Sequence, residues 1–249
     1  MTSLITYKYQ AVKILISRMF STLAFLLLIT TPALAEGVVI KNLGHSSLLI
    51  KGEGKSILLN PFKAVACAEG LTEPRLKVDY ILANSLLADE GARIAEGIFF
   101  VQPGSYVVND FHLEGLQVPH DRMGGRRFGY ATLWTWEQGG LKFAHLGGSA
   151  SSISLEDEQL LGRPDVLILA VGGGAKVYDG QEAALIVQQL KPKVVIPVQY
   201  LRGKAPRNCD QNGIQPFLDA MKDVAVKKVG NTFPIKTNIP AQTIIYLMD

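Results

Sequence analysis

A strand–helix–strand pattern in the second half of the chain constrains the fold more than any other feature. Residues 165–171 and 194–198 are short, mainly apolar runs of the kind that form buried strands. Between them, residues 181–190 carry Ala184, Val187 and Leu190 at helical spacing. A helix between two buried strands is typical of an α/β domain.

The first half of the chain is predicted to be mainly β-structure. Apolar runs separated by Gly, Pro, Asn and Asp predict a meander, a βα unit and an antiparallel hairpin. The expected strands are residues 38–40, 47–50, 56–59, 79–83, 98–101, 106–116, 130–137 and 141–146, with a helix over 85–96. A short helix at 215–222 and a strand at 244–247 follow the second half's main pattern. Since no repeat or linker divides residues 36–249, one domain is expected there.

The first 35 residues have the pattern of a secretory signal peptide. They contain three basic residues and no acidic residue, then an apolar run over 23–29 and an Ala33-Leu34-Ala35 cleavage site. The apolar run is shorter than the roughly 20 residues that span a bilayer. We therefore expect cleavage and export to a periplasm or thylakoid-type lumen, with membrane attachment only through an uncleaved leader.

The balance of charge argues against nucleic acid as a partner. The leader carries three of the 25 basic residues and none of the 22 acidic ones, so the rest of the chain has 22 of each. Binding to DNA or RNA is driven by neutralisation of phosphates by Lys and Arg. A neutral domain without a dense basic run lacks this footprint.

Four blocks of sequence form an ordered set that spans nearly all of the chain after the leader. They are residues 43–50 with Asn60-Pro61-Phe62, residues 78–82, residues 143–149, and a fourth block made of residues 165–173, 182–184 and 190–200. This set resembles the branch of the metallo-β-lactamase superfamily that contains ascorbate-6-phosphate lactonase-like Zn-dependent hydrolases. The resemblance implies an α/β (α+β) fold: a four-layer αββα sandwich with its site on loops at one edge of two sheets.

The resemblance also implies metal chemistry, because hydrolases of this branch use zinc or manganese to lower the pKa of a bound water. This chain departs from the family's His-x-His-x-Asp-His motif, whose ligand positions hold Asn84, Leu86, Ala88 and Asp89. Further replacements affect the bridging aspartate, a histidine and another aspartate, now Gly148, Gln199 and Asn60. Most of the family's metal ligands are therefore missing.

Histidines leave a second interpretation open. His45 and His145 lie in family blocks, and His120 resembles a further histidine at the edge of the family's site. Three protein ligands suffice for catalytic zinc, so these residues could form a reduced single-metal site; the alternative is three structural histidines. Carboxylates near them are Asp89, Glu90 and Asp121, which could instead form turns or cap helices.

A small-anion site is a third candidate. The N–H groups of Gly172 and Gly173 could face an anion, and Arg126 and Arg127 could clamp a phosphate or carboxylate. A tight turn and a solvated arginine pair are the alternative interpretations.

Two cysteines, Cys67 and Cys209, can pair in only one way. Each follows a family block at the edge of the ancestral site, so a disulfide would tie two loops across the cleft. Two buried free thiols are the alternative.

These residues together predict an exported metallo-β-lactamase-fold protein without a required cofactor, which binds an unidentified protein or a small anionic ligand and does not catalyse hydrolysis. The alternative is a metal-dependent hydrolase of a lactone or phosphoester that uses zinc or manganese in the reduced site.

Overall fold

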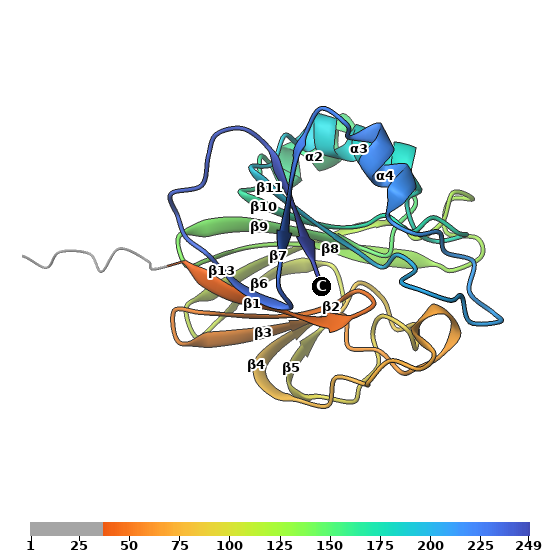
Figure 1. Cartoon of the computed structure of the whole chain (residues 1–249). Helices are drawn as coiled ribbons and strands as arrows, with labels where there is room; N and C mark the ends of the chain where they lie inside the picture. Colours follow the sequence, from red (N-terminus) through yellow and green to blue (C-terminus); the bar gives the residue numbers. More distant parts are fainter. Residues whose placement is uncertain (1–36) are drawn as a thin grey trace, which may run out of the picture. The chain divides into compact units, whose positions relative to one another are not determined.

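The computed structural model describes residues 37–249, which belong to one compact unit, so the expected leader over 1–35 lies outside the described residues. Two β-sheets lie face to face (Figure 1). One sheet has six strands in the order β13 (Thr232–Ile235), β1 (Val38–Gly44), β2 (Ser47–Gly52), β3 (Lys55–Leu59), β4 (Lys77–Leu82) and β5 (Glu96–Phe100). None of the described helices is both long and apolar enough to cross a membrane.

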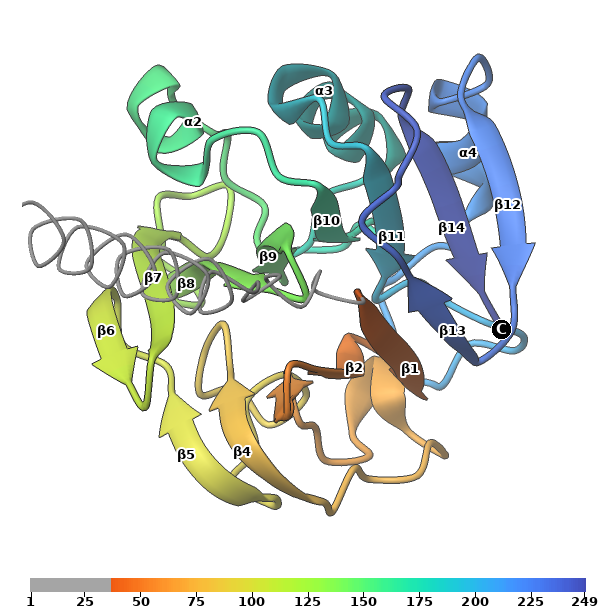
Figure 2. The ribbon, with the colours of Figure 1, turned by 90° about the vertical axis from the view of Figure 1, so that its left-hand side faces the viewer.

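The second sheet has eight strands and carries the helices. Its order is β12 (Ala225–Val229), β14 (Ile244–Met248), β11 (Val194–Val198), β10 (Val166–Ala170), β9 (Leu141–Gly147), β8 (Tyr130–Gln138), β7 (Phe111–Pro119) and β6 (Gly104–Val108). Its outer face is covered by α2 (Leu155–Leu161), α3 (Gly180–Leu190) and α4 (Gln215–Ala220), which lie on one side in Figure 2. Within residues 37–249 the remaining helical element is a 3₁₀ turn, η1 (Ala66–Ala68), in the loop after β3.

The strand–helix–strand prediction is confirmed by β10, α3 and β11. These two strands pair in parallel, with Ile168 opposite Ile196. Ile168 packs into the core between the sheets, whereas Leu167 packs beneath α3 against Val187. Both faces of β10 are buried, which is the physical reason for its almost wholly apolar sequence. A capping box starts α3, because Asp179 accepts from two N–H groups of its first turn.

The predicted helix over 85–96 is wrong. This segment forms an irregular loop after β4, with Leu86 exposed and Asp89 and Glu90 turned toward the interior. Neighbouring residues of a helix project about 100° apart, so a helix could not aim both carboxylates at one cluster. The helical composition is thus overridden by the contacts of two acidic side chains.

Candidate functional site

Loops at the ends of several strands converge on one edge of the two sheets. His45, Asn60 and Gln199, which follow β1, β3 and β11, have left-handed backbones with φ of 51°, 42° and 51°. The backbone of Gln199 is fixed by donation from its N–H to the carbonyl of His45, at 2.9 Å. Strained backbone of this kind is typical of functional sites, because the surrounding structure must hold it in place.

The side-chain amides of Asn60 and Asn84 bond to each other. Asn60 Nδ2 donates to Asn84 Oδ1 at 2.6 Å, and the Asn84 backbone N–H donates to Asn60 Oδ1 at 2.9 Å. Asn84 Nδ2 donates to the carbonyl of Thr132 at 2.6 Å. This network joins the loops after β3 and β4 to β8 without any charged group.

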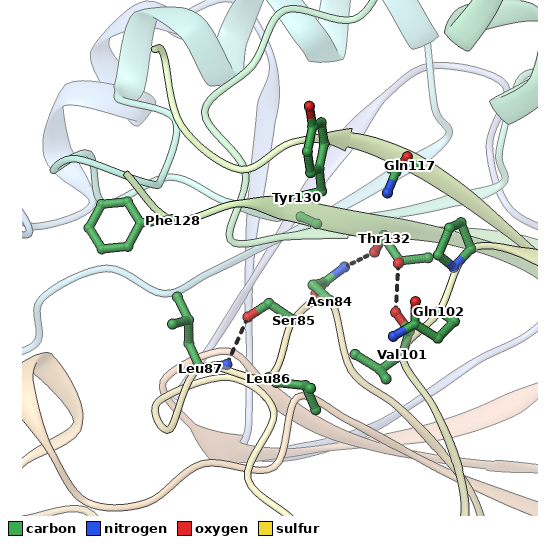
Figure 3. A pocket seen from close by; sticks show the side chains of 12 residues that line it. Asn84, Ser85, Leu86, Leu87, Val101, Gln102, Gln117, Phe128, Tyr130 and Thr132 are labelled. Carbon is green, nitrogen blue, oxygen red and sulfur yellow. Dashed lines mark hydrogen bonds between the residues drawn. The ribbon is translucent and has the colours of Figure 1, made fainter. Parts of the chain in front are cut away.

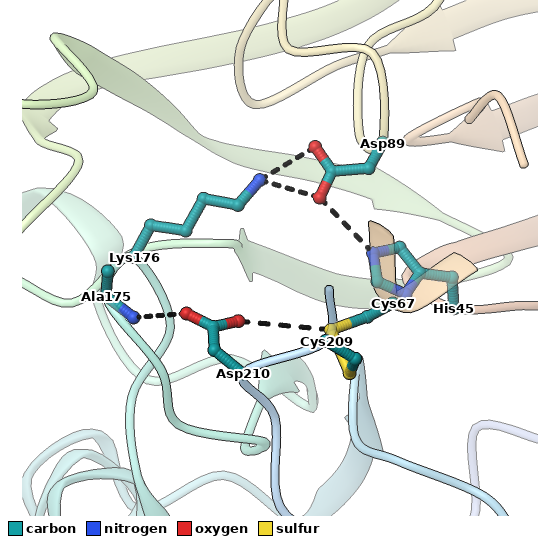
Figure 4. Close-up of a disulfide and its surroundings, with 7 residues drawn as sticks. All are labelled: His45, Cys67, Asp89, Ala175, Lys176, Cys209 and Asp210. Carbon is teal, nitrogen blue, oxygen red and sulfur yellow. Dashed lines mark hydrogen bonds and ion pairs between the residues drawn. A yellow bond between two sulfur atoms is a disulfide. The ribbon is translucent and has the colours of Figure 1, made fainter. Parts of the chain in front are cut away.

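A lysine, two carboxylates and two histidines lie beneath these loops, and we call them the Lys176 cluster. Lys176 Nζ donates to both oxygens of Asp89, at 2.8 and 2.9 Å, and lies 3.5 Å from Glu90 Oε1. His45 Nε2 lies 3.8 Å from Asp89 Oδ2, and His120 Nε2 lies 2.8 Å from Glu90 Oε1. Figure 4 shows Lys176 reaching Asp89 on the side opposite His45. The Lys176 side chain is 14% exposed, whereas that of Glu90 is wholly buried.

Electrostatics keep the cluster charged. Burial alone would raise the pKa of Asp89, but the nearby His45 imidazole and the ammonium of Lys176 hold it below its usual range. Burial likewise opposes ionisation of Glu90, and the charge of Lys176 with the contact to His120 lowers its pKa. In turn, burial would lower the pKa of Lys176, and the charges of Glu90 and Asp89 raise it. One ammonium thus faces two carboxylates in a poorly solvated site.

Gly148 makes room for this arrangement. A Cβ atom at position 148 would overlap Glu90 Oε2 and lie 3.3 Å from Gln199 Oε1. The Glu90 carboxylate therefore fills the space that a side chain at position 148 would enter.

His145 lies at the bottom of the site and is fully buried in β9. Among the described residues neither ring nitrogen of His145 has a hydrogen-bond partner, and the same holds for Oε1 of Gln199. Burial lowers the pKa of His145 to about 3, against a smaller opposing effect of Glu90. The imidazole is therefore neutral at physiological pH.

The fold family implies a metal, and the donor set of this chain does not fit one. In residues 37–249 no three His, Cys, Asp or Glu side chains are arranged to hold a metal ion. The carboxylates that would bind a divalent cation already bind the ammonium of Lys176. A metal ion would have to displace that ammonium, since two cations cannot share this small buried space without strong repulsion.

The glycine turn after β10 is filled by a carboxylate of the chain itself. Asp210 Oδ2 accepts from the N–H of Ala175 at 3.0 Å, and a Cβ at Gly174 would lie 2.6 Å from the Asp210 carboxyl carbon. The guanidinium of Arg122 donates to the carbonyl oxygen of Gly174 at a distance of 2.6 Å. At the predicted anion site the N–H of Gly173 donates to the carbonyl of Tyr178 at 2.8 Å, and the Asp210 carboxylate contacts the turn at Gly174 and Ala175.

Arg126 and Arg127 lie in another loop, which Asp121 organises. Asp121 accepts from the N–H groups of Met123, Gly125, Arg127 and Phe128, so it is a turn former. The Arg126 side chain donates to the carbonyl of Met123, and that of Arg127 lies over the Phe128 ring. Within residues 37–249 neither arginine side chain bonds to the glycine turn, so the structure does not assemble the expected clamp.

Cys67 and Cys209 form a disulfide between the loop after β3 and the loop after β11, 142 residues apart in sequence. It lies close to the Lys176 cluster, with Asp210 between the two (Figure 4). This bond joins the two sheets' loops at the mouth of the site.

Two grooves lie at the loops that form the site. The first, which we call the Tyr130 groove, has a volume of about 340 Å³ and lies between the loop after β4 and strands β7 and β8 (Figure 3). The second has a volume of about 360 Å³ and is lined by His45 and Gln199 at its base and by Cys67, Arg202 and Lys204 at its rim. Of the Lys176 cluster, His45 lines the second groove, and no residue of the cluster lines the Tyr130 groove.

Residues 39–199 match the family model described as the beta-lactamase superfamily domain, which covers more than half of the chain. The chain belongs to the beta-lactamase superfamily. A UPF0173 protein of Pyrococcus abyssi is 26% identical over 189 residues, which are 63% of this chain and 80% of that protein.

Solved structures of this superfamily share the fold. An inferred Zn-dependent hydrolase of the metallo-β-lactamase superfamily from Thermotoga maritima has a TM-score of 0.67 and 22% identity, covering 85% of this chain and all of that one. An inferred metal-dependent hydrolase from Parabacteroides distasonis has a TM-score of 0.57 and 16% identity, covering 75% and 89%. At these identities the likeness concerns the fold, so function depends on the site.

The structure brings together part of the set of residues that the sequence singled out. Asp89, His45 and His120 belong to the Lys176 cluster, whereas Leu86 and Ala88 are exposed on the loop. Sequence reasoning missed Lys176 altogether, because a lysine two residues after a glycine turn has no distinctive pattern. Only the tertiary contact with Asp89 gives it significance.

Proposed function

We propose that this beta-lactamase-superfamily protein binds a ligand or partner without metal-dependent hydrolysis. The observation that supports the proposal is the ammonium of Lys176 between Asp89 and Glu90, beside a glycine at position 148. Metal-dependent hydrolysis requires an ion that activates water and polarises the substrate. A protonated lysine supplies one positive charge beside the two carboxylates, but it has no coordination position at which water could be activated.

Metal content tests this proposal. Protein purified without chelators is expected to contain far less than one zinc, manganese or iron per chain and to gain none on dialysis against zinc. Incubation with a lactone and with a phosphodiester is expected to give no turnover above buffer. Stoichiometric metal that disappears in a His145→Ala variant would overturn the proposal.

A reduced single-metal hydrolase is the second candidate, and the unpartnered ring nitrogens of His145 favour it. In that case His45, His120 and His145 would hold the metal, with zinc or manganese supplying activation of a water molecule. Their replacement by Ala would then abolish both metal binding and hydrolysis of a lactone or phosphoester. Elemental analysis measures the loss of metal in these variants. A native circular dichroism spectrum shows that this loss comes from the missing ligands and not from unfolding.

We further propose that the protein works after export. The leader-like pattern of residues 1–35 and the disulfide between Cys67 and Cys209 support this location, since disulfides persist mainly in oxidising compartments.

A further inference from the structure

The Tyr130 groove has a chemical character that distinguishes it from the second groove. Among its lining residues, all within the described chain, there is no Asp, Glu, Lys, Arg or His; they are Asn84, Ser85, Leu86, Leu87, Val101, Gln102, Pro103, Gln117, Phe128, Tyr130, Ala131 and Thr132. A phosphate or carboxylate would lose its hydration there without gaining an opposite charge. The groove therefore disfavours an anion, in contrast to the expected arginine clamp.

The floor of the groove is polar but fully bonded to the protein. Ser85 Oγ donates to Glu90 Oε1 at 2.8 Å, and Thr132 Oγ1 donates to the carbonyl of Val101 at 2.7 Å. Asn84 is held by the amide network described above. Because these polar groups already have hydrogen-bond partners within the protein, they hold the floor in place. Ser85 connects the floor to the Lys176 cluster through its hydrogen bond to Glu90.

The rim, in contrast, presents free polar groups and aromatic rings. Gln102 and Gln117 are exposed from opposite sides of the groove, as Figure 3 shows, and their amides have no partner among residues 37–249. Tyr130 is 59% exposed and Phe128 is half-buried nearby. An exposed tyrosine at the mouth of a groove offers a flat apolar face together with a hydroxyl group.

We propose that the Tyr130 groove binds an uncharged, hydroxyl-rich ligand of the sugar class; this inference rests on the binding function proposed above and names its ligand. An amide both donates and accepts, as a hydroxyl group does, so Gln102 and Gln117 complement hydroxyl groups of either orientation. Tyr130 and Phe128 cover the apolar face of a sugar ring. Mainly apolar walls with a few placed polar groups are typical of small-molecule sites.

Calorimetric titration with 4-nitrophenyl glycosides tests the inference. The neutral glucoside, galactoside and N-acetylglucosaminide are the probes, and 4-nitrophenyl glucuronide is the matched charged control. At least one neutral glycoside is expected to bind with a Kd below about 1 mM, and the glucuronide about tenfold more weakly than the glucoside. Failure of all three neutral probes, or equal binding of the glucuronide and the glucoside, would overturn the inference.

Variants locate the binding to the groove. Tyr130→Ala and Gln117→Ala are expected to weaken binding of the best probe at least about fivefold. Gln188→Ala, at an exposed position on α3, is expected to leave it unchanged. Each variant's melting temperature is measured alongside, and if Tyr130→Ala unfolds the protein, Gln117→Ala decides the result. Equal binding by wild-type protein and a folded groove variant would contradict the assignment.

The same probe separates the two proposals. Release of coloured 4-nitrophenolate that stops when the metal is removed by a chelator would overturn the proposal of binding without metal-dependent hydrolysis and leave the sugar site intact. If no glycoside binds and the protein contains no metal, the sugar site is overturned and the non-hydrolytic function stands.

Discussion

At the scale of single residues, the site is determined by one cation. Lys176 contacts both Asp89 and Glu90, and the three side chains are largely or wholly removed from water. An ion pair in such a position contributes little net stability compared with apolar residues, but removal of one partner leaves an uncompensated charge. The stability of the protein is therefore sensitive to the loss of any one charge of the Lys176 cluster.

Replacement of Lys176 by Met is expected to lower the free energy of unfolding by about 3 kcal/mol, because two buried carboxylates lose their counter-ion. Urea denaturation at pH 7 measures the loss. The control is Lys193→Met, which breaks a 2.8 Å ion pair with Asp165 that is far more exposed and is expected to cost less than about 1 kcal/mol. Equal losses in the two variants would show that Lys176 is an ordinary surface lysine.

His145 is expected to make stability depend on pH. Its folded pKa of about 3 lies below its ordinary value of 6.5, so as the pH falls the unfolded chain binds the proton first. Stability is therefore complete above pH 6.5 and declines toward pH 3, by at most about 1.4 kcal/mol per pH unit. The unfolding free energy measured from pH 7 to 5, where most carboxyl groups stay ionised, should show this slope.

His145→Gln should flatten that slope, whereas His112→Gln, at an exposed position on β7, should retain it. An unchanged slope in His145→Gln would mean that another group takes up the proton.

At the scale of secondary-structure elements, loops that are distant in sequence are held together by covalent and capping interactions. The disulfide closes a segment of 142 residues, and α3 begins directly after the loop that carries Lys176. Both features fix the loops around the Lys176 cluster.

The double substitution Cys67→Ser with Cys209→Ser is expected to lower the unfolding free energy by about 4 kcal/mol, since the unfolded chain gains the freedom of a long open loop. Denaturant titration measures the loss. Wild-type protein treated with a reductant should lose a similar amount, and non-reducing gels should show faster migration only for the untreated wild type. If the substitution leaves the denaturation midpoint unchanged, the bond does not form in solution.

Loss of the α3 cap is expected to have a smaller effect. Asp179→Ala removes the acceptor for the N–H groups of Gln181 and Glu182 and should cost about 1 kcal/mol. Asp179→Asn, which keeps an acceptor oxygen, should cost clearly less. Thermal melting of both variants provides the comparison, and identical melting temperatures would argue against a stabilising cap.

At the scale of the whole molecule, residues 1–35, the expected leader, differ in charge from the rest of the chain. The leader supplies the excess of positive charge, and the remaining chain is neutral. Protein recovered from the periplasm of an expressing bacterium is expected to begin at Glu36, which intact mass measures. Substituting Gln at both Ala33 and Ala35 should block cleavage, and recovery of only full-length protein from the wild type would contradict the prediction.

The sequence determined the architecture of this chain. Runs such as 165–171 and 194–198 predict buried strands because both their faces must avoid water, and the spacing of Ala184, Val187 and Leu190 predicts the helix between them. The ordered family blocks predicted two sheets with a site at their edge. These features depend on local pattern, which a sequence displays directly. The strands β12 and β13 were not predicted. Every residue of β12 is exposed or half-buried, so the strand has no apolar face, and the four residues of β13 include Pro234, which argues against a strand.

Only the tertiary structure decided what occupies the site. Helical composition over 85–96 gave way to an irregular loop, because Asp89 and Glu90 gain a cation from a segment almost 90 residues away. The turn at Gly174 is filled by Asp210, and the uncharged Tyr130 groove arises where four separate segments meet. Pairing of buried charges and the lining of a groove both depend on which distant residues come into contact. The sequence pattern of one segment does not predict which distant segment it will contact.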